Sequence, residues 1–364
     1  MKPAHDCFSR SYAQARSRFL AAAAEAGLQV ESRPHPEKGR DGEELALDVA
    51  LDGAADAERL LILSSACHGV EGYCGNGVQV AALLDPAWCD HARACGVAVL
   101  YLHALNPYGF SHLRRTTHEN IDLNRNFLDF SQPLPVNAAY REVHPLLVPD
   151  EWPPADNDAA VAAFAAERGV AAFQAAVSGG QREFADGLFY GGTQPSWSNL
   201  ALREVLRAHG RRASRIGWID IHTGLGASGV GERIFAGPDD PVALRRARDW
   251  WAGAGATPVT SIHDGSSISA FVTGLMWTAL PQECPQAEYT GMALEFGTQP
   301  ILQVLQALRG DQWLQAHPQA PEPLAHAIKQ QVLDAFYTDT EDWQAQVLRQ
   351  SREALYQAAD GLAA

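Results

Sequence analysis

Short apolar runs alternate along the chain with longer segments that carry apolar residues every three or four positions. The runs predict strands buried on both faces at 60–65, 97–103, 216–221 and 292–296. A further strand, which alternates apolar and polar residues, is expected at 44–51. The periodic segments predict helices at 8–27, 77–84, 136–147, 158–177, 197–210, 241–251, 301–316, 321–337 and 341–359.

This order of elements predicts an α/β fold. We expect one domain over residues 1–364, built on a central mixed, largely parallel sheet with helices on both faces. A helical insertion at 130–212 and a C-terminal helical region at 301–364 complete the predicted architecture. Because the carboxyl ends of parallel strands carry the chemistry in such folds, polar residues at these ends are the first candidates for a functional site.

Composition narrows the classes of partner. The chain is 46% hydrophobic and 20% charged, which is typical of a globular protein. Its formal net charge of -15 argues against a nucleic-acid backbone or an anionic membrane surface as the main partner. No segment approaches the roughly 20 apolar residues of a membrane span, and the N-terminal segment lacks the apolar core of a signal peptide. We therefore expect a cytoplasmic protein.

The cysteines indicate a reducing environment. They form no CxxC pair and no dense framework, so we interpret them as reduced structural thiols. Cys67 is next to His68, so a reactive or metal-facing thiol at this position is an alternative. The full set is Cys7, Cys67, Cys74, Cys89, Cys95 and Cys284.

Two imidazoles and a carboxylate follow predicted strands. His68 and Glu71 lie just beyond strand 60–65, and glycines beside them let the backbone bend until both side chains face one point. His222 follows strand 216–221, so it reaches the same edge if both strands belong to one sheet. Three protein ligands with an open fourth position are typical of catalytic zinc. A single HxxE pattern also occurs by chance, and an isolated histidine is more often an ordinary core or loop residue.

Three acidic residues could assist such a metal. Glu295 lies within a buried apolar run, where a carboxylate is costly unless it is paired or faces a site. It could take a proton from water and return it to a leaving group, or it could form a buried ion pair that ties the sheet to a helix. Asp122 and Asp220 could each accept a hydrogen bond from the second ring nitrogen of a zinc-bound histidine.

The polar segment 111–130 supplies cations. Arg114, Arg115 and Arg125 occur in this irregular, charge-dense stretch, together with Asn124. Arginine recognises carboxylates in a bidentate manner and stabilises negative charge on a carbonyl oxygen. The alternative is a solvated cluster of salt bridges with the acidic residues of the same segment.

Together these segments resemble the ordered motifs of the zinc metallocarboxypeptidases similar to carboxypeptidase A. The superfamily also contains amidohydrolases of the succinylglutamate desuccinylase and aspartoacylase type, and the nearest resemblance is to a bacterial carboxypeptidase-like family. The resemblance covers residues 44–300, and four motifs in the family's order are far more specific than any one of them. They are HxxE at 68–71, DLNRNF at 122–127, DIHT at 220–223 and LEF at 294–296.

The resemblance implies a zinc-dependent hydrolase that cleaves an amide bond next to a free carboxylate. Zn²⁺ would be held by His68, Glu71 and His222, and Asp122 would orient His68. The partner would be a small molecule or a short peptide with a free carboxylate.

The resemblance also implies roles around the substrate. Asn124 and Arg125 would bind the free carboxylate, and Glu295 would act as the general base and acid. One of two adjacent arginines would polarise the scissile carbonyl. Neighbours in an extended segment point in opposite directions, so we expect Arg115 in that role, with Arg114 among the substrate-binding residues.

One departure from the family's pattern keeps alternatives open. Family carboxypeptidases carry a tyrosine that closes over the substrate between the second metal histidine and the catalytic glutamate. No tyrosine occurs here between Tyr190 and Tyr289. A small-molecule N-acyl amino acid deacylase and a non-catalytic protein that retains the metal are therefore alternatives. Tyr108, Phe110 and Trp197 could line a specificity pocket, although such aromatics are more often core residues.

Overall fold

The computed structural model describes residues 4–154, 157–253 and 257–364. These residues form one sheet that contains strands from both halves of the chain. Its strands are β1 (Val30–Lys38), β2 (Glu44–Asp52), β3 (Arg59–Ser64), β4 (Val97–His103), β5 (Arg215–Ser228), β6 (Gly231–Phe235), β7 (Val259–Thr260) and β8 (Glu288–Gly297).

The strand order in this sheet is β1-β2-β4-β3-β5-β8-β6-β7. The four central strands, β4, β3, β5 and β8, are parallel neighbours. Antiparallel pairings follow on either side, between β2 and β4, between β1 and β2, and between β8 and β6. The predicted α/β class with a mixed, largely parallel sheet is therefore confirmed.

Helices connect and cover the strands. They are α1 (Ala4–Cys7), α2 (Tyr12–Glu25), α3 (Gly72–Leu83), α4 (Pro86–Ala94), α5 (Pro107–Ser111), α6 (Tyr140–Leu147), α7 (Asn157–Arg168), α8 (Val170–Ser178), α9 (Trp197–Val205), α10 (Pro241–Trp250), α11 (Ala279–Glu283), α12 (Ile301–Ala316), α13 (Glu322–Phe336) and α14 (Glu341–Ala363). Short 3₁₀ segments occur at Gly69–Glu71, Leu123–Arg125 and Met276–Thr278, and a π-helical turn at Leu206–Gly210.

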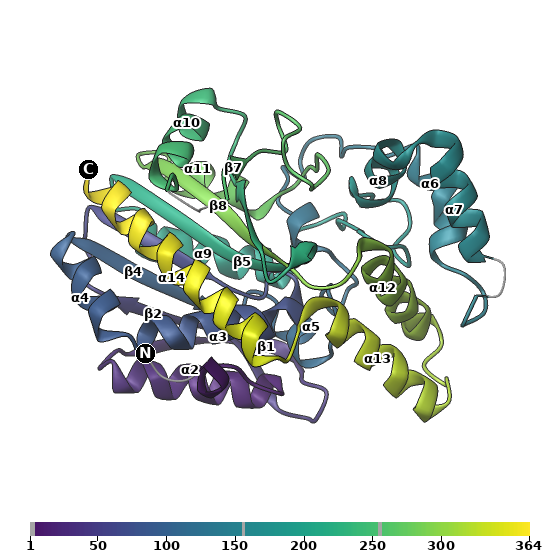
Figure 1. Ribbon diagram of the computed structural model, residues 1–364, viewed down its shortest axis with the longest axis horizontal. Coiled ribbons are helices and arrows are strands. Elements are labelled where there is room, and N and C mark those ends of the chain that lie inside the picture. The colour runs from purple at the N-terminus through teal and green to yellow at the C-terminus, as the bar shows by residue number, and fades with distance from the viewer. Residues whose placement is uncertain (1–3, 155–156, 254–256) are drawn as a thin grey trace.

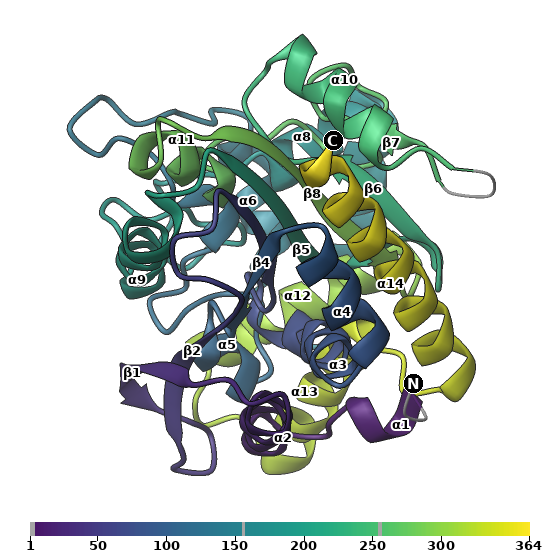
Figure 2. The same ribbon diagram turned by 90° about the vertical axis from the view of Figure 1, so that its left-hand side faces the viewer.

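Side chains of the central strands alternate between two apolar layers. In β3, Leu61 and Leu63 belong to the layer that contains residues of α2, α3 and α14. Leu60 and Ile62 belong to the opposite layer, which contains residues of α9 and α11. Figure 2 shows these two groups of helices on opposite sides of the strands. The alternation follows from the two-residue period of a strand, and it confirms the prediction of helices on both faces.

Some helices extend beyond the sheet. Helices α6, α7, α8, α12 and α13 gather at one end of the molecule, past the central strands (Figure 1). The predicted insertion 130–212 includes α6 to α8, but it also includes α9, which packs on the sheet. Among the described residues no single helix has both the length and the apolar composition to cross a membrane; α7 and α8, bent by 117°, meet these criteria only as a pair.

Several element boundaries differ from the prediction. The expected helix 158–177 divides into α7 and α8 at Gly169, whose φ of +86° favours glycine. Helix α3 begins at Gly72, before the expected start at residue 77, and Pro86 occupies the first turn of α4, where its missing N–H is tolerated. Strand β5 continues to Ser228, so His222 lies inside a strand and not after one.

His103, the last residue of β4, is fully buried among aromatic rings. Its ring stacks on that of Phe19 with 4.8 Å between the centroids. Neither of its ring nitrogens has a hydrogen-bond partner among the described residues. Burial is the main cause that lowers the pKa of His103 to about 4.

The free energy of unfolding of the variant His103→Phe should depend less on pH than that of the wild-type chain. An unfolded histidine has a pKa of about 6.5, so between that pH and about 4 the unfolded chain binds a proton that folded His103 does not. The free energy of unfolding therefore decreases as the pH falls, by about 3 kcal/mol in full. Urea unfolding between about pH 7 and about pH 4 measures this. The exposed His326→Phe is the control, and a wild-type pH dependence in His103→Phe contradicts the assignment.

Candidate metal centre and its cavity

His68, Glu71 and His222 lie together at the carboxyl end of β3 and the middle of β5. Glu71 lies between the two imidazoles, with Oε1 2.9 Å from Nδ1 of His68 and Oε2 2.9 Å from Nδ1 of His222. The three candidate ligand atoms lie within 4.8 Å of one another, and all three residues are buried. The structure thus brings together the three residues expected to bind metal.

A tight backbone contact sets the position of Glu71. After β3 the chain turns into the 3₁₀ segment Gly69–Glu71, and Gly69 packs against the backbone of Gly109. A Cβ atom at position 69 would lie 2.1 Å from the carbonyl carbon of Gly109, so only glycine fits there. The N–H of Gly69 also donates to the carbonyl of Arg115. Residue 115 is therefore held close to the turn that presents Glu71.

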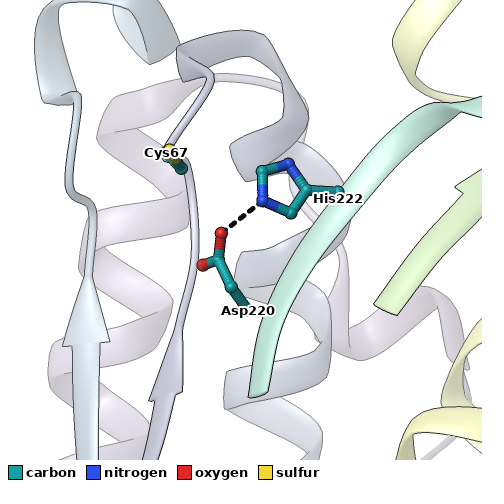
Figure 3. A group of neighbouring side chains, drawn as sticks. All are labelled: Cys67, Asp220 and His222. Atoms are coloured by element: carbon teal, nitrogen blue, oxygen red, sulfur yellow. Dashed lines mark ion pairs between the residues drawn. The ribbon is translucent and has the colours of Figure 1, made fainter. Parts of the chain in front are cut away.

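Each imidazole contacts an aspartate through its second nitrogen. Nε2 of His68 lies 3.3 Å from Oδ1 of Asp122, and Nε2 of His222 lies 2.5 Å from Oδ2 of Asp220. Figure 3 shows Asp220 and His222 on one strand, with the carboxylate turned toward the ring. Both aspartates thus occupy the positions expected from the sequence, and both leave Nδ1 directed toward Glu71.

Two residues that sequence reasoning missed hold Asp220. The hydroxyl of Ser64 donates to Oδ1 of Asp220 at 2.5 Å, and the indole N–H of Trp218 donates to Ser64 Oγ at 2.7 Å. Ser64 and Asp220 are opposite each other in the parallel pairing of β3 with β5. This register is a property of the folded sheet, and no local pattern marks Ser64 in the sequence.

The donor set fits a divalent cation with nitrogen and oxygen ligands, such as Zn²⁺. Two imidazole nitrogens and a carboxylate converge, while Asp220 at Nε2 of His222 favours the tautomer of that ring that ligates through Nδ1. Burial alone would raise the pKa of Glu71, but His68 and His222 hold it well below its usual range. Burial would lower the pKa of His222, but Asp220 raises it well above its usual range.

Cys67, Asp220 and His222 form a second group of possible ligand atoms (Figure 3). Burial, reinforced by the negative charge of Asp220, raises the pKa of the Cys67 thiol well above its ordinary value. Thiol ligands bind metal as thiolates, so this group is the poorer candidate. No disulfide joins the six cysteines, all of which lie among the described residues.

Glu295 lies on the strand next to His222. The two residues are opposite each other in the parallel pairing of β5 with β8, and both line the same cavity. Oε1 of Glu295 accepts a hydrogen bond from the N–H of Leu225 at 3.1 Å. Burial, followed by the negative charge of Glu71, raises the pKa of Glu295 to about 8. A carboxyl group that titrates near neutral pH is suited to both accepting and donating a proton.

Arg115 joins the acidic residues of the centre. Its Nε donates to Asp122 at 2.9 Å, and its Nη1 donates to Glu71 at 3.3 Å. The ring of Phe189 lies 5.3 Å from the guanidinium carbon of Arg115 and 5.5 Å from that of Arg125. Sequence reasoning missed Phe189, because the only signal for it is its position in the folded chain.

Asn124 and Arg125 line the cavity, as expected for residues that bind substrate. Nε and Nη2 of Arg125 donate to the carbonyl of Ser178, at 3.0 and 2.5 Å. Oδ1 of Asn124 accepts from the N–H of Met276 at 3.1 Å. Burial lowers the pKa of Arg125 to about 10, so its guanidinium is still a cation at neutral pH.

Four other candidates lie outside the cavity. Arg114 does not face it: its Nε donates to Asp311 at 3.1 Å, on the opposite side of the segment from Arg115. Tyr108, Phe110 and Trp197 are likewise not among the described residues that line the cavity. Phe110 is fully buried in the core.

The cavity beside the candidate metal ligands has a volume of about 540 Å³. We call its charged inner end the floor, which consists of His68, Arg115, Asn124, Arg125, His222 and Glu295. Its wall is mainly apolar and comes from α8, β6, α12 and the segment 262–277. No tyrosine is among the described residues that line it, which matches the missing tyrosine in the sequence.

One family model covers nearly the whole chain. The family is described as a protein of unknown function, DUF2817, and its model matches residues 8–350. The chain belongs to the DUF2817 family. No curated protein matches this family member.

Solved structures are similar to this chain at low sequence identity. Bovine thrombin-activatable fibrinolysis inhibitor, in complex with tick carboxypeptidase inhibitor, is 11% identical, with 97% of each chain covered and a TM-score of 0.50. A metallo-carboxypeptidase from Pseudomonas aeruginosa is 16% identical, with 95% of this chain and 69% of the other covered and a TM-score of 0.46. The predicted carboxypeptidase-like fold is confirmed by the first of these.

Asp122→Asn should weaken zinc binding by about 10- to 100-fold, because the amide no longer supplies the negative charge beside Nε2 of His68. Competition with a chromophoric chelator measures the affinity. The control is Asp129→Asn, which changes an exposed acid of the same segment. If the Asp122 and Asp129 variants bind zinc with equal affinity, Asp122 has no role in holding the metal ligand His68.

Proposed function

We propose that this protein is a zinc-dependent hydrolase that cleaves an amide bond next to a free carboxylate. The observation that carries the proposal is the bridging position of Glu71, between Nδ1 of His68 and Nδ1 of His222. Both histidines line the cavity that Glu295 and Arg125 also line. Metal ligands, a titratable carboxyl group and a cation for the substrate carboxylate thus border one space.

The residues of the chain would divide the reaction among them. Arg125 and Asn124 would hold the substrate carboxylate and so fix the position of the amide bond. Glu295 would take a proton from the attacking water at a carboxylate oxygen and return it to the leaving nitrogen. Arg115 would donate hydrogen bonds to the carbonyl oxygen as negative charge develops on it. Bound zinc would supply Lewis acidity for the carbonyl and for water.

Removal of zinc should abolish hydrolysis, and its return should restore it. Dialysis against a chelator, followed by assay of N-acyl amino acids and short peptides with free carboxyl ends, tests this. Zinc added back in equimolar amount should recover the activity, with metal content measured in parallel. Hydrolysis that persists in chain shown to lack metal would disprove the mechanism.

Glu295→Gln distinguishes an enzyme from a binding protein that only retains metal. The amide has nearly the same shape but cannot accept the proton, so we expect turnover to fall by about 10²- to 10⁴-fold. Zinc content should be unchanged, because Glu295 is not among the three candidate ligands. Wild-type and variant chains that both bind zinc but hydrolyse none of the compounds would favour the binding role.

A further inference from the structure

We propose that the cavity accepts a long acyl chain, so that the substrate is an amino acid N-acylated with a fatty acid. This inference rests on the hydrolase function proposed above and concerns its substrate class. In the reaction water is added across the amide: the C–N bond breaks, the acyl carbon keeps the water oxygen as a fatty acid, and the nitrogen of the amino acid takes a proton.

The rim of the cavity exposes large apolar side chains. Val170 of α8 is 75% exposed, Ile268 is 47% exposed, and Ile301 and Leu302 at the start of α12 are 54% and 69% exposed. All four line the cavity. Nine large apolar side chains stand out as exposed among the described residues, and these four belong to one opening. Such a cluster indicates an apolar ligand and not a scatter of surface residues.

The wall between floor and rim offers little to a peptide backbone. All charged side chains that line the described cavity belong to its floor. Of the polar side chains of the wall, Gln174, Ser178, Thr223 and Ser269 already donate to protein carbonyls, so Gln299 and the indole N–H of Trp277 are the remaining side-chain donors there among the described residues. Each residue of a bound peptide would bring an N–H and a C=O that need partners, and burial without them is costly. A hydrocarbon chain has no such requirement.

The direction of the cavity fits this substrate. Asn124 and Arg125 lie at the floor and are 4% and 5% exposed, so a carboxylate held there is at the inner end. The other end of the molecule, on the acyl side of the amide, then extends past the candidate metal ligands toward the apolar rim. The volume of about 540 Å³ lies in the range of pockets that enclose most of a small ligand.

Chain-length dependence of binding tests the inference without turnover. Calorimetry with zinc-loaded Glu295→Gln would compare N-acetyl-, N-hexanoyl- and N-decanoyl-leucine below their micelle-forming concentrations. We expect the dissociation constant to fall by about three- to fourfold for each added methylene, until the chain fills the cavity. Equal affinities for the acetyl and decanoyl compounds would overturn the proposal.

Variants at the rim locate the acyl chain. Val170→Asp and Leu302→Asp should each weaken binding of decanoyl-leucine by tenfold or more and leave that of acetyl-leucine unchanged. Val136→Asp and Val242→Asp are matched controls, because these valines are 76% and 66% exposed but do not line the cavity. Equal effects of all four variants would mean that the chain binds elsewhere, and the proposal would fail.

Two further outcomes separate the possibilities. If N-acetyl-trileucine binds more tightly than decanoyl-leucine, and with the same dependence on Val170 and Leu302, the cavity takes peptides and the acyl proposal is wrong. If zinc-loaded wild-type chain binds decanoyl-leucine with the expected chain-length dependence but does not hydrolyse it, the acyl assignment stands and the proposed hydrolase function fails.

Discussion

A dense group of charged side chains is buried at the carboxyl ends of the central strands, and the rest of the structure must supply partners for them. Glu71, Asp122 and Asp220 are at most 1% exposed. An isolated carboxylate in such a place would be very costly, and it is tolerated only with partners that return the lost hydration. Here each carboxylate contacts an imidazole, and Arg115 lies between Glu71 and Asp122. The positions of the surrounding segments follow from this requirement.

The partners come from segments that are far apart in the sequence, so the fold itself must align them. The parallel register of β3 with β5 places Ser64 against Asp220, and that of β5 with β8 places His222 beside Glu295. The close contact of Gly69 with the segment after β4 brings in Arg115. A shift of one residue in either pairing would turn these side chains to the opposite face. Strong apolar packing on both faces of the sheet therefore also protects the geometry of the polar centre.

The sequence was most informative where chemistry and local pattern coincide. His68 and His222 could be found because each is linked to a continuous apolar run, and such runs identify buried strands without knowledge of the rest of the chain. The sequence could assign different directions to Arg114 and Arg115 only from the general rule that neighbouring side chains of an extended segment alternate. The partner of Arg114 is Asp311, on a helix far along the sequence, and no residue pattern near position 114 predicts this contact. Contacts of this kind require the tertiary structure.

The contrast between the floor and the wall of the cavity has a physical consequence of its own. Electrostatic interactions strengthen as water is excluded, so the apolar wall makes Arg115, Glu295 and Arg125 act more strongly on anything bound between them. Because the same wall is mainly apolar, it offers few alternative partners for a ligand's polar groups. The sheet edge contributes the charges, whereas α8 and α12, which lie beyond the sheet, contribute the exposed apolar rim. In the proposed function, chemistry would therefore be carried by the charged floor of the cavity, and selectivity by the helices at its rim.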